Sequence, residues 1–151
     1  MDELAINVEK TQYIKIRLGD EFFGIDIKYV DNIVRMQHIT RVPKAPEYVK
    51  GVINLRGEVI PVFSLRLKMG LEEIEENKHF RIIILKVEGE CVGIIVDEVK
   101  EVANLSPDEI EKVTHNNTEV GFHNFLFGVG KTESTLISLL DVNEVLSEEA
   151  V

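Results

Sequence analysis

Apolar and polar side chains alternate over two neighbouring stretches near the start of the chain. In residues 14–18 and 23–27, isoleucine, leucine or phenylalanine stands at every second position, and Gly19-Asp20 lies between the two stretches. A period of two is typical of strands with one buried face, and a glycine-containing pair between them favours a tight turn. The pattern predicts a β-hairpin, preceded by a flexible N-terminus over residues 1–12.

The hydrophobic period changes after this hairpin. Val30, Ile33 and Val34 have the i, i+3, i+4 spacing of a helix, which predicts a short helix or helical turn near residues 28–35. Two prolines, at positions 43 and 46, then indicate a loop. The first part of the chain is therefore expected to contain a hairpin, a helical turn and a loop.

A second hairpin is predicted over residues 51–63, with Arg56-Gly57 as its turn. Pro61 lies in the return strand and favours an edge strand or a bulge, because proline has no N–H to donate to a neighbouring strand. A helical turn over residues 65–69 is expected to follow and to end at Gly70.

The second half of the chain shows a similar order of patterns. Residues 79–87 and 91–96 flank a Gly-Glu turn and predict a further hairpin. Ser106 and Glu109 have the spacing of a capping box, which predicts a helix from here to Val113. The last expected elements are two strands and a capped helix, at residues 125–129, 135–140 and 141–146.

The two halves also align with each other. A shift of about seventy positions superimposes their first hairpins, and a slightly larger shift superimposes the later elements. Any two strand-rich halves share some alternation, so the stronger signal is glycine spacing: Gly24 matches Gly93, and Gly51 matches Gly128. Duplication predicts two related barrel subdomains that share a core, because one such unit alone buries little area. The expected boundaries are about 13–70 and 79–146, with an acidic linker at 72–76 and a tail at 147–151.

Composition and charge narrow the class of protein. The chain has 151 residues, 44% of them hydrophobic and 29% charged, which is typical of a folded globular protein. A net charge of -10 disfavours nucleic acid and anionic lipid as partners. The apolar runs are too short to span a bilayer, and Met1-Asp2-Glu3-Leu4 lacks the pattern of a signal peptide. We therefore expect a cytoplasmic protein without membrane insertion.

Residues that would support chemistry are scarce. Cys91 is the single cysteine and lies in an apolar run, so it excludes an intrachain disulfide and is interpreted as a small buried side chain. The sequence contains no nucleophile elbow, phosphate loop or zinc-ligand spacing. Asp97 and Asp141 follow strands, where turn or capping roles are expected. We predict no enzyme activity, no cofactor and no metal site; the alternative is a small enzyme or ligand-binding barrel with a pocket around His115 and His123.

Several segments resemble the pattern of CheW-like domains, and the resemblance runs from about Tyr13 to Leu146. The resembling segments are Phe23-Gly24-Ile25-Asp26-Ile27, Val42-Pro43, Tyr48-Val49-Lys50-Gly51-Val52-Ile53-Asn54-Leu55-Arg56-Gly57, Val59-Ile60-Pro61-Val62, Gly93-Ile94-Ile95-Val96-Asp97 and Leu139-Leu140-Asp141-Val142. The resemblance implies a mainly β fold of two intertwined five-stranded SH3-like barrels with a few short helices, forming one domain over 13–146. It also implies an adaptor that couples chemoreceptor cytoplasmic tips to the histidine kinase CheA at membrane-associated receptor arrays.

The short chain favours a free-standing coupling protein over a module attached to a kinase or receiver domain. A CheW-like adaptor of another receptor–kinase pathway is the alternative within the same family.

The resemblance also implies a receptor-binding site in a groove between the barrels. The matching positions are Val30, Asn32, Ile33 and Arg56. Arg56 can offer a rigid guanidinium to a carboxylate, and Val30 and Ile33 either close the core or receive the apolar face of a helix. Asn32 departs from the glutamate that the family often has, so it offers only neutral hydrogen bonds.

Two glycines in the same segment are further candidates for partner contact, Gly51 and Gly57. A side chain at Gly51 would disturb a close approach of backbone near the partner surface. The kinase is expected to bind an apolar patch on the first barrel, whose residues the spacing does not identify.

Overall fold

Short strands make up most of the structure, a computed structural model that describes residues 9–113 and 122–147. The strands in these ranges are β1 (Thr11–Leu18), β2 (Glu21–Asp26), β3 (Val30–Arg35), β4 (Val49–Leu55), β5 (Glu58–Ser64), β6 (Arg81–Val87), β7 (Glu90–Val96), β8 (Glu98–Leu105), β9 (Ile110–Lys112), β10 (Leu126–Lys131) and β11 (Leu136–Leu140). The helices are α1 (Leu65–Lys68) and α2 (Val142–Val145), and the 3-10 turns are η1 (Ile27–Tyr29), η2 (Pro107–Glu109) and η3 (Phe122–Phe125). No helix of these described ranges is long and apolar enough to cross a membrane.

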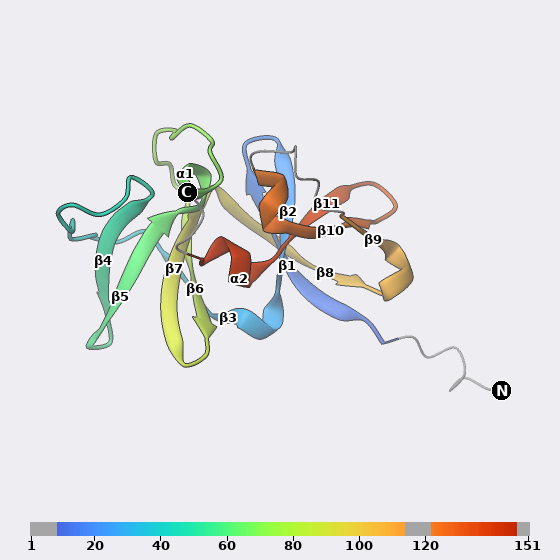
Figure 1. Cartoon of the computed structure of the whole chain (residues 1–151), viewed down its shortest axis with the longest axis horizontal. Coiled ribbons are helices and arrows are strands. Elements are labelled where there is room, and N and C mark those ends of the chain that lie inside the picture. Colours follow the sequence, from blue (N-terminus) through green and yellow to red (C-terminus); the bar gives the residue numbers. More distant parts are fainter. Residues whose placement is uncertain (1–8, 114–121, 148–151) are drawn as a thin grey trace.

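The strands form two sheets that lie side by side (Figure 1). One has the order β3-β6-β7-β5-β4, and the other has the order β8-β1-β2-β11-β10-β9. We call the first the continuous barrel, because its strands are consecutive in the chain, and the second the split barrel, because it joins the first two strands to the last four. The fold is therefore mainly β, with two SH3-like barrel subdomains, as predicted.

The repeated elements occupy equivalent places in the two barrels. Strands β1, β2, β3, β4 and β5 of the first half correspond to β6, β7, β8, β10 and β11 of the second half, and α1 corresponds to α2. The halves 13–70 and 79–146 nevertheless do not coincide with the two barrels. Each barrel takes strands from both halves, because the repeat units exchange strands instead of closing on themselves.

The same connection closes both barrels. In the continuous barrel, Thr40 and Val52 exchange two backbone hydrogen bonds of 2.8 Å, which join the segment after β3 to β4. In the split barrel, Glu111 of β9 pairs with Val129 of β10 at the equivalent position. The split barrel has six strands because this closing segment is long enough there to form β9.

Gly51 makes the closure of the continuous barrel possible. Its φ is +143°, and a Cβ atom placed on it would lie 2.1 Å from the carbonyl oxygen of Thr40. The close backbone approach that the sequence suggested at Gly51 is therefore present, but the approaching backbone belongs to the same chain.

The core lies mainly between the barrels. One cluster joins buried side chains of the split barrel, such as Ile16 and Phe23, to those of the continuous barrel, such as Ile83 and Leu85. A second cluster fills the continuous barrel and includes Ile84 from the opposite face of the same strand, β6. Because β6 is buried on both faces, its sequence is a continuous apolar run and does not alternate.

Two predicted helices are confirmed only at their starts, as the 3-10 turns η1 (Ile27–Tyr29) and η2 (Pro107–Glu109), and are wrong beyond them. Residues 30–35 form β3, which pairs with β6 through Ile33 and Ile83, although their apolar spacing is helical. Pairing with a buried strand overrides the local period, and a register shift between Val30 and Asn32 lets the strand present its apolar residues irregularly. The capping box at Ser106 is present, but it begins only the 3-10 turn η2, because the chain must then pair with β10 as β9.

Three smaller expectations also need correction. Residues 11 and 12 belong to β1 and pair with β8, and residues 1–8 lie outside the described ranges. Pro61 lies in an inner strand, β5, which its neighbour β7 joins only from Val62 onwards. The missing N–H of Pro61 therefore costs no hydrogen bond to β7. Cys91 is half-buried instead of buried.

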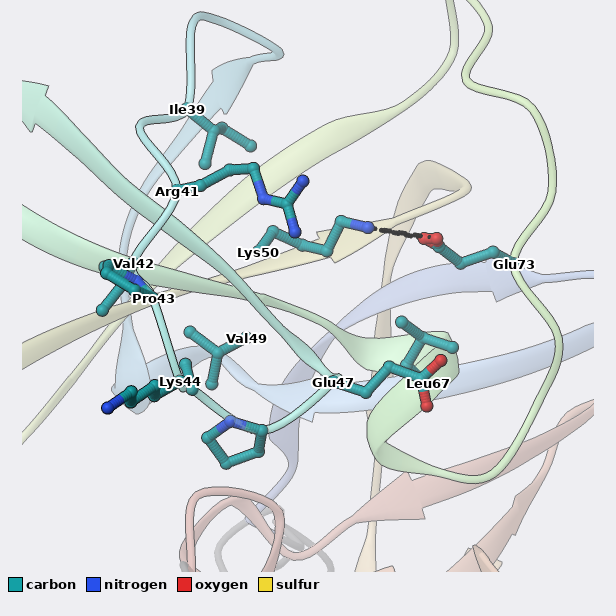
Figure 2. A pocket seen from close by; sticks show the side chains of 12 residues that line it. Ile39, Arg41, Val42, Pro43, Lys44, Glu47, Val49, Lys50, Leu67 and Glu73 are labelled. Atoms are coloured by element: carbon teal, nitrogen blue, oxygen red, sulfur yellow. Dashed lines mark hydrogen bonds and ion pairs between the residues drawn. The ribbon is translucent and has the colours of Figure 1, made fainter.

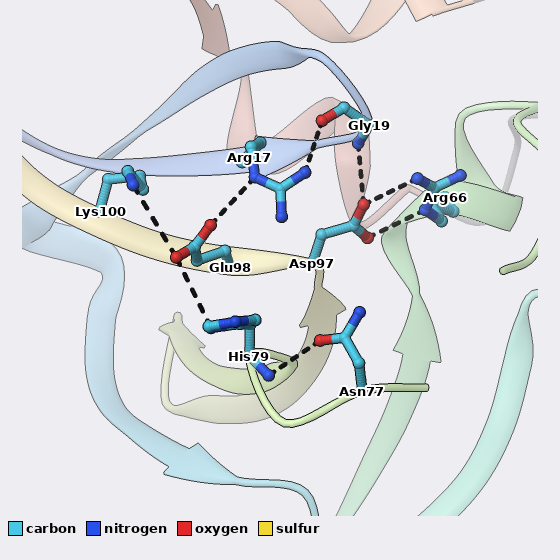
Figure 3. Close-up of polar contacts among 8 residues, drawn as sticks. All are labelled: Arg17, Gly19, Arg66, Asn77, His79, Asp97, Glu98 and Lys100. Carbon is cyan, nitrogen blue, oxygen red and sulfur yellow. Dashed lines mark hydrogen bonds and ion pairs between the residues drawn. The ribbon is translucent and has the colours of Figure 1, made fainter. Parts of the chain in front are cut away.

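Asp97 forms a buried ion pair where the two barrels meet (Figure 3). Its carboxylate accepts hydrogen bonds from Arg66 Nε (2.9 Å) and Nη2 (2.7 Å), and from the backbone N–H of Gly19 (2.8 Å). The side chains of Asp97 and Arg66 are 3% and 13% exposed. Burial alone would raise the pKa of Asp97, but these hydrogen bonds outweigh it and hold the pKa below its usual value. The carboxylate thus fixes the β1–β2 turn to α1, in a structural role as expected.

We expect Gly51→Ala to lower the free energy of unfolding by at least about 2 kcal/mol, because the new methyl group would collide with the Thr40 carbonyl. Gly57→Ala is the matched control: its φ is also positive, at +84°, but a Cβ atom there meets nothing within 4 Å. Urea unfolding of both variants tests this. If both variants lost the same unfolding free energy, backbone strain alone would explain the loss, and contact with the Thr40 carbonyl would play no part.

The Asp97 ion pair should also control stability in acid. Because the pKa of Asp97 is lower in the folded than in the unfolded protein, its contribution is complete above about pH 4 and is lost as pH falls through the folded pKa. We expect Asp97→Asn to lower the free energy of unfolding by about 3 kcal/mol at pH 7. Between pH 7 and pH 3, the variant should then lose less stability than wild type does. Urea unfolding at both pH values measures this, with the exposed Glu75→Gln as charge-matched control. Wild-type and Asp97→Asn curves that stay parallel with pH would contradict the assignment.

Candidate functional site

Arg56 lies at the tip of the β4–β5 hairpin. Leu55 pairs with Glu58, so Arg56 and Gly57 form a two-residue turn, and both have positive φ, at 55° and 84°. This geometry matches a type I′ turn, in which Gly57 is favourable and an arginine costs about 1 kcal/mol of backbone strain. Asn54 Oδ1 accepts a hydrogen bond of 3.0 Å from the Gly57 N–H and supports the turn. The Arg56 residue is exposed, and in the described ranges no hydrogen bond or ion pair occupies its guanidinium.

Val30, Asn32 and Ile33 lie on β3, the strand at one edge of the five-stranded sheet. All three are half-buried. Val30 and Ile33 pack against the core cluster that the two barrels share. Asn32 Oδ1 accepts a hydrogen bond of 2.8 Å from the N–H of Ile33, so its side-chain oxygen is turned back on its own strand.

The hairpin tip and β3 lie on the same side of the continuous barrel (Figure 1). Cys91 lies at the start of β7, which stands between β3 and β5 in the order of strands. Burial raises the pKa of its thiol first, and the negative charges of Glu58, beside the hairpin turn, and Asp31, on β3, raise it further. The structure thus places Val30, Asn32 and Ile33 together on β3, while no described contact joins Arg56 to any of them.

Sequence reasoning missed several apolar side chains around the shared core. Tyr29 and Val99 are half-buried and pack against the same cluster as Val30 and Ile33, and Ile27 is 38% exposed. The internal repeat carried the signal for one of them, because Val99 is the repeat equivalent of Val30.

A hollow of about 810 Å³ opens elsewhere on the continuous barrel, between the β3–β4 loop and α1 (Figure 2). Its apolar lining includes Val42, which is 44% exposed. Three basic residues also line it, Arg41, Lys44 and Lys50. Two glutamates, Glu47 and Glu73, line it as well, and Glu73 is paired with Lys50. In the described ranges, Arg41 and Lys44 have no ion pair, and they favour a partner that carries carboxylates.

The described residues offer little for a metal or an acid–base centre. No group of three or more His, Cys, Asp or Glu residues suited to a metal ion occurs in the described ranges. His115 lies outside them, and His123 belongs to η3. Asp141 Oδ1 accepts a hydrogen bond from the N–H of Glu144 and caps α2, as predicted.

Comparison with known proteins gives one family. The family model described as the CheW-like domain matches residues 12–150. The chemotaxis protein CheW of Helicobacter pylori is 35% identical over 143 residues, which cover 95% of this chain and 86% of that protein. The chemotaxis protein CheW of Bacillus subtilis is 37% identical over 131 residues, which cover 85% and 81%.

A solved structure agrees with these relatives. The crystal structure of the scaffolding protein TtCheW from Thermoanaerobacter tengcongensis superimposes with a TM-score of 0.85 at 31% identity, covering 94% of this chain and 96% of that one. The agreement extends over both barrels and nearly the full length of each chain. This chain therefore belongs to the CheW-like family.

Proposed function

We propose that this protein is a non-enzymatic adaptor that couples chemoreceptor cytoplasmic tips to the histidine kinase CheA in chemotaxis signalling. The observation that carries the proposal is the match to the CheW-like family over residues 12–150, across both barrels. An adaptor needs two surfaces that partners can occupy together. The β3 side and the hollow are two such surfaces on the continuous barrel. The adaptor would act in the cytoplasm and be recruited to receptor arrays through these contacts.

The receptor would bind the side formed by β3 and the β4–β5 hairpin tip. Val30 and Ile33 are half-buried on the shared core, so a helix laid over them would gain apolar contact without unfolding the strand. Arg56 lies at the tip of the β4–β5 hairpin, on a turn that holds its backbone fixed. A guanidinium without an internal partner can bind a carboxylate or the C-terminal carbonyls of a receptor helix.

Asn32 offers the receptor no charge on β3. A glutamate at this position would offer a negative charge on β3, whereas Asn32 is neutral and its oxygen already accepts the Ile33 N–H. Gly57, which allows the turn, would act by positioning Arg56, and Gly51 would contribute through barrel closure.

The kinase would bind the hollow beside α1. The exposed Val42 and its apolar neighbours provide the patch on the first barrel that the sequence led us to expect. This surface is separate from the receptor side, so that both partners can bind at once. The two carboxylates that follow strands have structural partners: Asp97 is paired with Arg66, and Asp141 caps a helix.

Arg56→Ala should weaken binding of a purified receptor tip about tenfold or more, because a charge-assisted hydrogen bond is lost. The variant should unfold at the same urea concentration as wild type, since the turn and its Asn54 hydrogen bond remain. Calorimetric titration measures the affinity.

Glu88→Ala provides the control for this experiment. Glu88 occupies the same position of the β6–β7 turn, with φ of 53°, so the change alters a turn of the same type without touching Arg56. An unchanged receptor affinity in Arg56→Ala, or an equal loss in Glu88→Ala, would remove Arg56 from the site.

Binding to the kinase should be reversible and of micromolar affinity, and Val42→Asp should weaken it. A carboxylate at this 44% exposed position would face a partner that we expect to carry carboxylates, and it would also reduce apolar contact. Calorimetry with the CheA regulatory domain measures the change, and the receptor tip serves as control ligand. Loss of both partners would indicate misfolding, and loss of neither would show that the kinase binds elsewhere.

A further inference from the structure

The segment that joins the two repeat units lies along the hollow as a strap, which we define as residues 71–78. It follows Gly70 and forms no helix or strand. Its first end is held by α1: the Leu71 N–H donates to the Arg66 carbonyl (2.8 Å), and Arg66 Nη1 donates to the Glu72 carbonyl (2.8 Å). Its other end is held at Asn77, whose carbonyl accepts the N–H of Phe80 (3.2 Å).

The middle of the strap has a single described attachment. Lys50 Nζ forms an ion pair with Glu73, at 3.0 Å from Oε1 and 2.5 Å from Oε2. Figure 2 shows this pair at the side of the hollow. Within the described ranges, no other hydrogen bond or ion pair holds the side chains of residues 73–76.

The Lys50–Glu73 pair borders both the hollow and a smaller cavity. Both residues line the hollow and also a cavity of about 170 Å³. Ile74 of the strap lines this inner cavity together with Phe80, and Ile74 is 45% exposed. If the middle of the strap moved outwards, the hollow and the cavity would join into one larger site with both charged and apolar side chains in its lining.

The solvent exposure of the ion pairs that hold the strap indicates which of them breaks most easily. The side chains of Lys50 and Glu73 are 37% and 44% exposed, so water and salt screen their attraction. An exposed pair of this kind shifts an equilibrium by no more than about fivefold. The Arg66–Asp97 pair behind the strap, at 13% and 3% exposed, is far better protected. The middle of the strap can therefore open while its ends stay fixed.

The charged side chains that line the hollow indicate which kind of ligand would open the strap. Lys50 belongs with Arg41 and Lys44 to the basic lining of the hollow, and Glu73 is the internal carboxylate that occupies Lys50. A carboxylate on a segment entering the hollow would compete with Glu73 for the same ammonium group. The exchange replaces one exposed ion pair by another, so it has little intrinsic cost.

We propose that the Lys50–Glu73 pair is a latch, and that an acidic segment of the partner in the hollow opens it by replacing Glu73 on Lys50. The proposal rests on the proposed function for the identity of that partner, the kinase regulatory domain. Glu73 of the strap then competes with the partner for Lys50 and lowers the affinity of the protein for the partner. Binding of the partner is also coupled to movement of the strap, which joins the two repeat units.

The latch itself can be tested without any partner. In a Cys91→Ala background, Ile74→Cys places the only thiol on the strap, and its rate of modification reports strap opening. Adding Glu73→Gln should raise this rate severalfold. Adding Glu75→Gln, which removes the same charge from the same strap but has no described ion pair, should leave it unchanged. Equal rates in the two variants would overturn the latch.

Calorimetry with the CheA regulatory domain tests the competition. Glu73→Gln should tighten binding about two- to fivefold, whereas Glu75→Gln should have a smaller effect. Lys50→Gln gives the sharpest contrast: it should raise the thiol modification rate, as Glu73→Gln does, but weaken binding, because the partner loses its cation. Equal affinities in Glu73→Gln and Glu75→Gln would exclude competition. If wild type fails to bind the kinase domain, the proposed function fails, and the thiol rates still decide the latch.

Discussion

Pairings between strands of the two repeat units hold the rest of the structure in place: β1–β8 and β3–β6 are antiparallel, and two shorter pairings are parallel. Strand β2 pairs with β11 through Gly24 and Leu139, and β5 pairs with β7 through Val62 and Gly93. Each pairing brings one strand from each half of the chain into the same sheet. The shared core follows from this exchange, because it places apolar faces of both halves against each other. The β3 side and the hollow depend on the same framework.

The sequence predicted the elements whose pattern is set locally. The hairpins followed from alternation and glycine turns, the α2 cap from Asp141, and the repeat from the spacing of Gly24 and Gly93. The identity of β3 was missed, because its pairing partner β6 lies about fifty residues away and no local signal reports such a contact. The strand exchange was implied by the family resemblance alone, since alternation does not specify which half supplies the neighbouring strand.

The candidate site was predictable to a similar extent. Position along the chain identified Arg56 as a turn residue, but only the structure shows positive φ, an exposed side chain and the absence of a described internal partner. The hollow could not be read from the sequence, because its lining comes from the β3–β4 loop, α1 and the strap. The acidic stretch 72–76 was interpreted as a solvated linker, and its residues are exposed; the ion pair of Glu73 with Lys50 was not predicted.

The order of strands in the chain has a consequence for biosynthesis. The strands of the continuous barrel follow one another in the chain from Val30 to Val96. All of them therefore leave the ribosome before β8 to β11 do. Strands β1 and β2 are made first but must wait for β11, more than a hundred residues later, before their sheet is complete. Until then the hairpin exposes Ile16 and Phe23, both of which are buried in the finished protein. A nascent chain of this family is thus most vulnerable to aggregation in its earliest strands, and docking of that hairpin on the completed barrel would shield it.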